Sequence, residues 1–115
     1  MTITRQKVGP RMSQAVVHNG TVYLAGQVAA DAGPSAAAQT EQILKQIDGL
    51  LASVGSSKSK LLSATIYLAS MSSYAEMNKV WDAWVDAANT PARATVEAQL
   101  AQPKYLIEIA VIAAA

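Results

Sequence analysis

The apolar residues of this chain repeat with two different periods, and this pattern constrains its fold more than any other feature. In residues 35–54 and 74–85, apolar side chains recur three and four positions apart, as along one face of a helix. The other apolar runs alternate every second residue or are rich in β-formers, as in strands of a half-buried sheet. These runs are residues 2–8, 15–18, 21–25, 61–69, 93–100 and 105–113. The pattern therefore predicts an α+β fold of order β-β-β-α-β-α-β-β.

Local signals place the turns and the ends of the first helix. Asn19-Gly20 lies between two β runs and predicts a hairpin, because a type I′ turn needs two positive φ angles. Ser35 is positioned to cap the helix over residues 35–54, and Gly55 is positioned to end it. Gly49 costs this helix about 1 kcal/mol relative to alanine, so we expect it to mark close packing against the sheet.

The second helix is predicted to begin with a capping box. Ser73 would accept a hydrogen bond from an early backbone N–H, and Glu76 would reach back to the N–H of Ser73. Two amphipathic helices can cover only one face of the predicted sheet. We therefore expect the other face to contact further copies of this chain.

Length and composition support one small domain that self-associates. The 115 residues are enough for a single domain, 1–115, but not for two cores. Only 15% of the residues are charged and 51% are hydrophobic, against an average of about 25% charged. A domain this poor in charge is expected to bury apolar surface against partner subunits.

Composition also excludes several kinds of chemistry. The chain has no cysteine, so thiol nucleophiles and metal–thiolate sites are excluded, and His18 is its only histidine. The net charge of +1 favours no nucleic-acid partner. The first ten residues lack the apolar core of a signal peptide, and no stretch is long enough to span a membrane. We expect a cytoplasmic protein with no metal site.

Arg93 and Glu108 are the residues most suited to carry chemistry. Arg93 follows a helix terminus and begins a strand, where its planar guanidinium could bind a carboxylate. It could equally be a solvated edge residue or pair with Glu97. Glu108 lies in the most apolar strand, so its carboxylate is paired, at an interface, or functional. Burial would raise its pKa and a nearby arginine would lower it, which leaves the direction open.

Three further features carry weaker signals. Gly26, in Ala-Gly-Gln at the end of the hairpin, would let backbone N–H groups approach a ligand, although such glycines more often mark bulges or turns. His18 is best interpreted as a solvated residue beside the hairpin turn. Trp81 and Trp84, at helical spacing, are most simply core packing.

With these residues in view, the chain resembles the RidA (YjgF-type) reactive-intermediate deaminase family over nearly its whole length. Pro-Ala-Arg at 91–93 and Ile-Glu-Ile at 107–109 form the specific signature, with the arginine and glutamate fifteen residues apart. This spacing predicts two hairpin strands that bring Arg93 and Glu108 to one site. The supporting segments are Gly-Pro at 9–10, Ser-Gln-Ala-Val at 13–16, Gly-Thr-Val-Tyr-Leu-Ala-Gly-Gln at 20–27, Gln-Thr-Glu-Gln at 39–42 and Met-Asn-Lys-Val-Trp at 77–81.

The resemblance implies a fold and an activity. The fold would be chorismate-mutase-like: a mixed, mostly antiparallel sheet with two helices on one face, assembled into a homotrimer with a cleft at each subunit boundary. The activity would be hydrolysis of 2-imino acids, such as 2-iminopropanoate and 2-iminobutanoate, and their enamine tautomers to 2-keto acids and ammonia. No cofactor is implied, because an iminium is already an electrophile.

The resemblance also implies roles for single residues. Arg93 would hold the substrate carboxylate, and Glu108 would position the attacking water and help ammonia leave. Backbone groups near Gly26 and Thr95 would bind substrate or water, and Asn78 would lie in the cleft.

The chain departs from the family pattern at three places. A tyrosine common after Gly-Pro is replaced by Arg11-Met12, a serine before Gly-Gln by Ala25, and a cysteine two residues after the signature arginine by Thr95. Carboxylate binding should survive these changes, while substrate range and rate should differ.

Two other hypotheses remain open. One is a trimer that binds small carboxylates or a partner protein without turnover. The other is a nuclease, which the near-neutral charge makes a poor fit.

Overall fold

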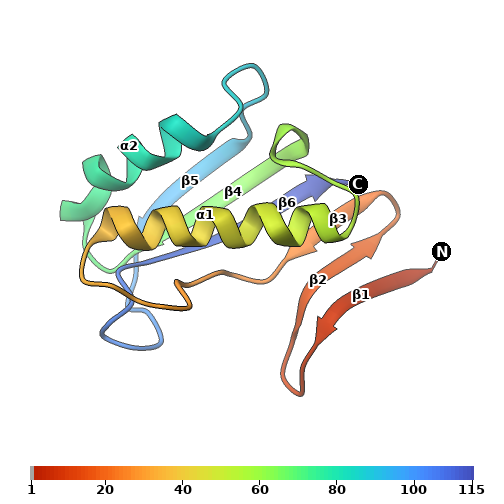
Figure 1. Ribbon diagram of the computed structural model, residues 1–115, viewed down its shortest axis with the longest axis horizontal. Helices are drawn as coiled ribbons and strands as arrows, with labels where there is room; N and C mark the ends of the chain where they lie inside the picture. The colour runs from red at the N-terminus through yellow and green to blue at the C-terminus, as the bar shows by residue number, and fades with distance from the viewer. Residues whose placement is uncertain (1) are drawn as a thin grey trace.

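A computed structural model describes residues 2–115 and contains one six-stranded sheet with both long helices on one face (Figure 1). The strands are β1 (Ile3–Val8), β2 (Ser13–His18), β3 (Thr21–Leu24), β4 (Leu61–Leu68), β5 (Ala92–Glu97) and β6 (Ile107–Ala114). The helices are α1 (Ala36–Ser53) and α2 (Tyr74–Trp84), with 3-10 turns η1 (Lys58–Lys60) and η2 (Met71–Ser73). The predicted α+β class and element order are confirmed.

The strands lie in the order β1-β2-β3-β6-β4-β5, and β4 and β5 are the parallel pair in an otherwise antiparallel sheet. A parallel pair needs a crossover connection, and α2 with the segment around it supplies one. Because β4 pairs with both β5 and β6, it lies between them. The prediction that the strands of Arg93 and Glu108 form a hairpin is therefore wrong.

The predicted turn and the ends of α1 are confirmed. Asn19 and Gly20 have φ of 53° and 77°, as the β2–β3 hairpin requires. Ser35 Oγ accepts a hydrogen bond from the N–H of Ala38 at 3.0 Å. Gly55 has φ of 76° just beyond the helix, a conformation that glycine adopts without a steric cost.

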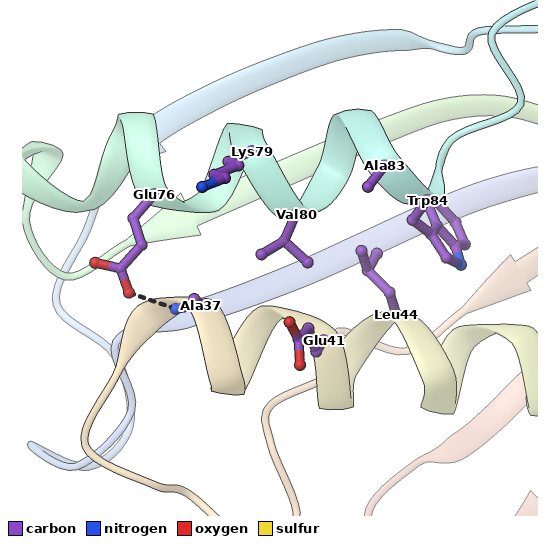
Figure 2. A pocket seen from close by; sticks show the side chains of 8 residues that line it. All are labelled: Ala37, Glu41, Leu44, Glu76, Lys79, Val80, Ala83 and Trp84. Carbon is purple, nitrogen blue, oxygen red and sulfur yellow. Dashed lines mark hydrogen bonds between the residues drawn. The ribbon is translucent and has the colours of Figure 1, made fainter.

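The predicted capping box of α2 is wrong. The Ser73 side chain makes no capping hydrogen bond, because Ser73 belongs to the η2 turn and has φ −87°, ψ 0° instead of an extended conformation. Glu76 Oε2 accepts a hydrogen bond from the N–H of Ala37 at 2.6 Å (Figure 2). This bond joins α2 to the first turn of α1 and satisfies one of that helix's free N–H groups.

The two faces of β6 have different surroundings. Its alternate residues Ile107, Ile109, Val111 and Ala113 are buried in the core that the helices cover. Glu108 and the residues that alternate with it are half-buried on the opposite face. We call this opposite face of the sheet the open face.

Two packing expectations are wrong. Alternation along residues 61–69 predicts that Leu62 shares a face with Ala64, which is buried. Leu62 is instead 52% exposed, because a register shift between Leu61 and Ser63 turns it away from the core. Gly49 packs against nothing: a Cβ added there would have no heavy atom within 4 Å beyond its own helical surroundings.

Candidate functional site

Arg93 lies on the edge strand β5 and on the helix side of the sheet. It is opposite Ala64 in the parallel β4–β5 register, and Ala64 faces the core. The Arg93 guanidinium carbon is 5.4 Å from the centroid of the Trp81 ring on α2, a cation–π contact. The Glu97 carboxylate accepts instead from the N–H of Met71 at 2.9 Å. Arg93 is thus held over an aromatic ring, and Glu97 is occupied elsewhere.

Two buried polar atoms on the same pair of elements have no hydrogen-bond partner among residues 2–115. They are Oδ1 of Asn78, one turn before Trp81 on α2, and Oγ1 of Thr95, two residues after Arg93 on β5. A buried acceptor or hydroxyl without a partner costs about 1–3 kcal/mol. We call Arg93, Thr95 and Asn78 the edge cluster; its polar atoms are available to bind a ligand.

Glu108 lies on the open face, at the wall of a cavity of about 320 Å³. Its carboxylate rests against the backbone of Gly26. A Cβ on that glycine would overlap Glu108 Oε2 and lie 3.0 Å from Glu108 Cδ. A larger residue here would displace the Glu108 carboxylate from this position. The cavity is lined by Gly26, Tyr67, Ala98, Gln99, Leu100, Ala101, Glu108 and Ala110.

The segment that carries Gly26 is held by a network of neutral amides. The backbones of Gln27 and Ile109 exchange two hydrogen bonds, of 2.8 and 3.0 Å, directly beside Glu108. The buried Gln27 side chain donates to Gln14 Oε1 at 2.8 Å and accepts from Gln46 Nε2 at 3.2 Å. Gln46 in turn accepts from the N–H of Ala30 at 3.0 Å. The position of Gly26 against Glu108 is thus fixed from both α1 and β2.

The proposed site residues form two groups that do not meet within one chain. The edge cluster lies between β5 and α2, whereas Glu108 and Gly26 lie on the open face. Strand β4 separates β5 from β6. Tyr67, on β4, also lines the cavity directly opposite Glu108. The sequence alone does not single out Tyr67, because alternation predicts the face on which a side chain lies but not its partner on the neighbouring strand.

The remaining candidates have structural surroundings. His18 pairs with Thr21 at the hairpin turn. Trp81 is 5% exposed and its ring centroid lies 5.4 Å from that of Trp84. The Trp84 indole N–H donates to Asp48 Oδ2 at 3.0 Å. Both tryptophans therefore pack in the helix layer, as predicted.

A larger cavity, of about 590 Å³, lies between α1 and α2, away from Glu108. Figure 2 shows Leu44, Val80 and Trp84 along it, with Glu41 and Lys79 at its sides. Its lining is largely aliphatic and aromatic, and its charged groups are of both signs. No three His, Cys, Asp or Glu side chains within residues 2–115 are grouped to hold a metal ion. None of the helices in this part of the chain is long and apolar enough to cross a membrane.

Comparison with known proteins gives one consistent result. The family model for endoribonuclease L-PSP matches residues 3–115. The RutC family protein YoaB of Escherichia coli K12 is 47% identical over 114 residues, which cover 99% of both chains. A solved structure of a YjgF family member from Neisseria meningitidis superposes with a TM-score of 0.97 at 51% identity, covering 99% of this chain and 95% of the other. A Rid family protein of unknown function from Yersinia pestis gives 0.86 at 32% identity, covering 94% and 90%.

Proposed function

We propose an activity for this chain, which belongs to the YjgF/RutC/Rid (endoribonuclease L-PSP) family. The proposed activity is the hydrolysis of 2-imino acids and enamines to 2-keto acids and ammonia. The observation that carries the proposal is the Glu108 carboxylate, which lies over Gly26 at the wall of a cavity suited to a small acid. A carboxylate in that position can hold a water molecule and exchange protons with it.

The second part of the proposal is a homotrimer in which one chain's edge cluster meets another chain's Glu108. Arg93 and Glu108 leave the sheet on opposite faces, so a ligand that touches both needs two chains. The open face carries the apolar side chains that an interface would cover: Tyr23 is 46% exposed and Val96 is 43% exposed. A cyclic trimer would form three such sites from one repeated contact.

In this proposal Arg93 binds the substrate carboxylate through its planar fork of donors. Asn78 and Thr95, whose buried oxygens have no partner within residues 2–115, offer further hydrogen bonds. The cation–π contact between Arg93 and Trp81 limits the freedom of the guanidinium before substrate binds. Backbone groups beside Gly26 face the reacting end of the same ligand.

The proposed reaction begins with a protonated imine. The water oxygen forms a bond to the imine carbon, the C=N π pair moves to nitrogen, and Glu108 takes a proton from the water. Glu108 then returns that proton to the amino nitrogen of the carbinolamine. The C–N bond breaks, ammonia leaves, and loss of the hydroxyl proton gives the 2-keto acid. These steps need position and a proton relay and no further group.

The test is ammonia release from 2-iminopropanoate generated in place by an amino-acid oxidase. Wild-type protein should speed the release, and Arg93→Ala should remove most of the increase while light scattering still gives the trimer mass. Wild-type protein that binds 2-keto acids through Arg93 but gives no extra ammonia would support the non-enzymatic binder instead. A mass near that of one chain would exclude the shared site.

The family carries the name endoribonuclease L-PSP, so a nuclease activity can also be tested. The chain has nine Lys and Arg against eight Asp and Glu, which gives little attraction to a polyanion. We therefore expect no cleavage of single-stranded RNA at physiological salt. Cleavage that Glu108→Gln abolishes would favour the nuclease over the deaminase.

A further inference from the structure

The cavity on the open face contains a phenol that the proposed mechanism has not used. Tyr67 on β4 is the direct antiparallel partner of Glu108 on β6, and both side chains line the cavity. Directly opposite residues in antiparallel strands have Cβ atoms about 4.5–5.5 Å apart. The phenol and the carboxylate therefore stand side by side on one face of the sheet.

The neighbours of Tyr67 leave its hydroxyl free for a ligand. On its other side, in the β4–β5 register, lies Val96, which offers no polar side-chain group. Within residues 2–115 the Tyr67 hydroxyl forms no hydrogen bond. Tyr67 is half-buried and is one of the residues that line the cavity. A phenol O–H without a partner is a hydrogen-bond donor that is available to a ligand there.

We propose that Tyr67 is a catalytic residue that holds the attacking water together with Glu108; this inference rests on the proposed function. The phenol O–H donates to the water oxygen, and the water donates one of its hydrogens to the Glu108 carboxylate. One lone pair of the water oxygen then remains to attack the imine carbon. Two fixed partners orient the water where one would let it rotate, which is the entropic advantage of a positioned reactant.

The charges at the site give the two residues different tasks. Glu108 can accept the proton that the water loses, whereas the phenol O–H of Tyr67 serves as a hydrogen-bond donor. Tyr67 therefore keeps its proton throughout the reaction and transfers nothing. Its removal should slow the chemical step without weakening the binding of the substrate carboxylate, which is assigned to Arg93 on another chain.

The experiment compares Tyr67→Phe with Tyr23→Phe. Each change removes one phenol oxygen from the open face, but Tyr23 pairs with Ile112 and is not among the residues that line the cavity. For 2-iminopropanoate we expect kcat to fall about tenfold in Tyr67→Phe with KM within about twofold, and Tyr23→Phe to match wild type. Light scattering and circular dichroism establish that both variants are folded trimers.

A double-mutant cycle separates a shared water from a general effect on the site. Glu108→Asp shortens the side chain but keeps its carboxylate, so we expect this variant to retain a measurable rate. If Tyr67 and Glu108 hold the same water, Tyr67→Phe should slow the Glu108→Asp protein by much less than tenfold, because the water is already displaced. Independent effects would multiply, and this result would overturn the shared water.

The remaining outcomes are also decisive. An active wild type with an equally active Tyr67→Phe would overturn this inference and leave the proposed deaminase intact. An inactive wild-type trimer would overturn the deaminase and the role of Tyr67 with it.

Discussion

The edge cluster and the open-face cavity carry complementary chemistry but are built in different ways. Arg93 is held by the Trp81 ring, beside two buried oxygens that have no partner within residues 2–115. Glu108 rests on a glycine backbone that a network of hydrogen-bonded amides holds in place. The first region thus has buried polar atoms without a partner, whereas in the second a hydrogen-bonded amide network lies beside the carboxylate and an open cavity. This difference is expected if the two regions form one complete site only where two chains meet. Each of the following predictions tests the comparison between the two regions.

The largest effect should come from separating the two halves by mutation. Arg93→Ala and Glu108→Gln should each lower kcat/KM by about 100-fold or more. Trimers formed by unfolding and refolding the two variants together should regain activity, because some sites then combine an intact Arg93 with an intact Glu108 from different chains. The measurement is ammonia release before and after mixing. If mixing restores nothing, while each variant alone forms trimers, the two residues belong to one chain's site.

Gly26→Ala tests the open-face half. The added Cβ would collide with the end of the Glu108 side chain, which can swing away at little cost in stability. The displaced carboxylate should lower kcat by about 10- to 100-fold, while the thermal unfolding midpoint changes little. An alanine variant with wild-type turnover would mean that the contact with Gly26 does not set the position of Glu108.

Gly49→Ala is the matched change in the helix layer, and we expect it to raise the stability of the fold instead of lowering kcat. The Cβ enters open space on α1, and alanine is the better helix former, so unfolding in urea should require about 1 kcal/mol more. Turnover should not change. Gly55→Ala is the control: its φ of 76° makes alanine strained, and stability should fall. Destabilisation by Gly49→Ala would show that the helix packs there more tightly than the structure indicates.

We expect the smallest effect from a substitution in the loop between α2 and β5, which leads to Arg93, because it should change the titration of one carboxylate and leave turnover unchanged. The side-chain amide of Asn89 donates to Asp86 Oδ2 at 3.0 Å and lowers the pKa of Asp86 below its ordinary 3.8, with help from Ser59 and the Ala88 N–H. A lowered folded-state pKa adds stability above the unfolded pKa that is lost as the pH falls through the folded value.

Asn89→Ala should therefore raise the pKa of Asp86, as followed by carboxyl NMR during an acid titration. Turnover at neutral pH should be unchanged, since Asp86 is ionised there in both proteins. An unchanged titration of Asp86 would contradict the assigned role of the Asn89 amide.

Much of the fold could be predicted because its signals are local. The Asn19-Gly20 turn, the Ser35 cap and the alternation in β6 each depend on residues a few positions apart. The capping box failed for a physical reason of the same kind: the residues before α2 form a 3-10 turn that removes Ser73 from the extended conformation. Its partner Glu76 bonds instead to Ala37, a contact across 39 positions that no local pattern contains.

The candidate site was also predictable only in part. Residue type, spacing and resemblance were enough to choose its residues, which are Arg93, Glu108, Gly26, Thr95 and Asn78. Their grouping could not be predicted, since the expected hairpin of β5 and β6 is interrupted by β4. Tyr67 was missed because its significance comes only from the strand register that sets it opposite Glu108.

The sequence by itself determined which segments become helices and strands and which face of each strand is apolar, because periodicity and turn chemistry act over short separations. Tertiary structure alone decided that β4 would lie between β5 and β6 and that Arg93 and Glu108 would leave the sheet on opposite faces. Strand order and register depend on pairings between distant segments, which are selected by how the whole core packs. In this protein those pairings place the Tyr67 phenol beside the Glu108 carboxylate and put Arg93 on the other face of the sheet.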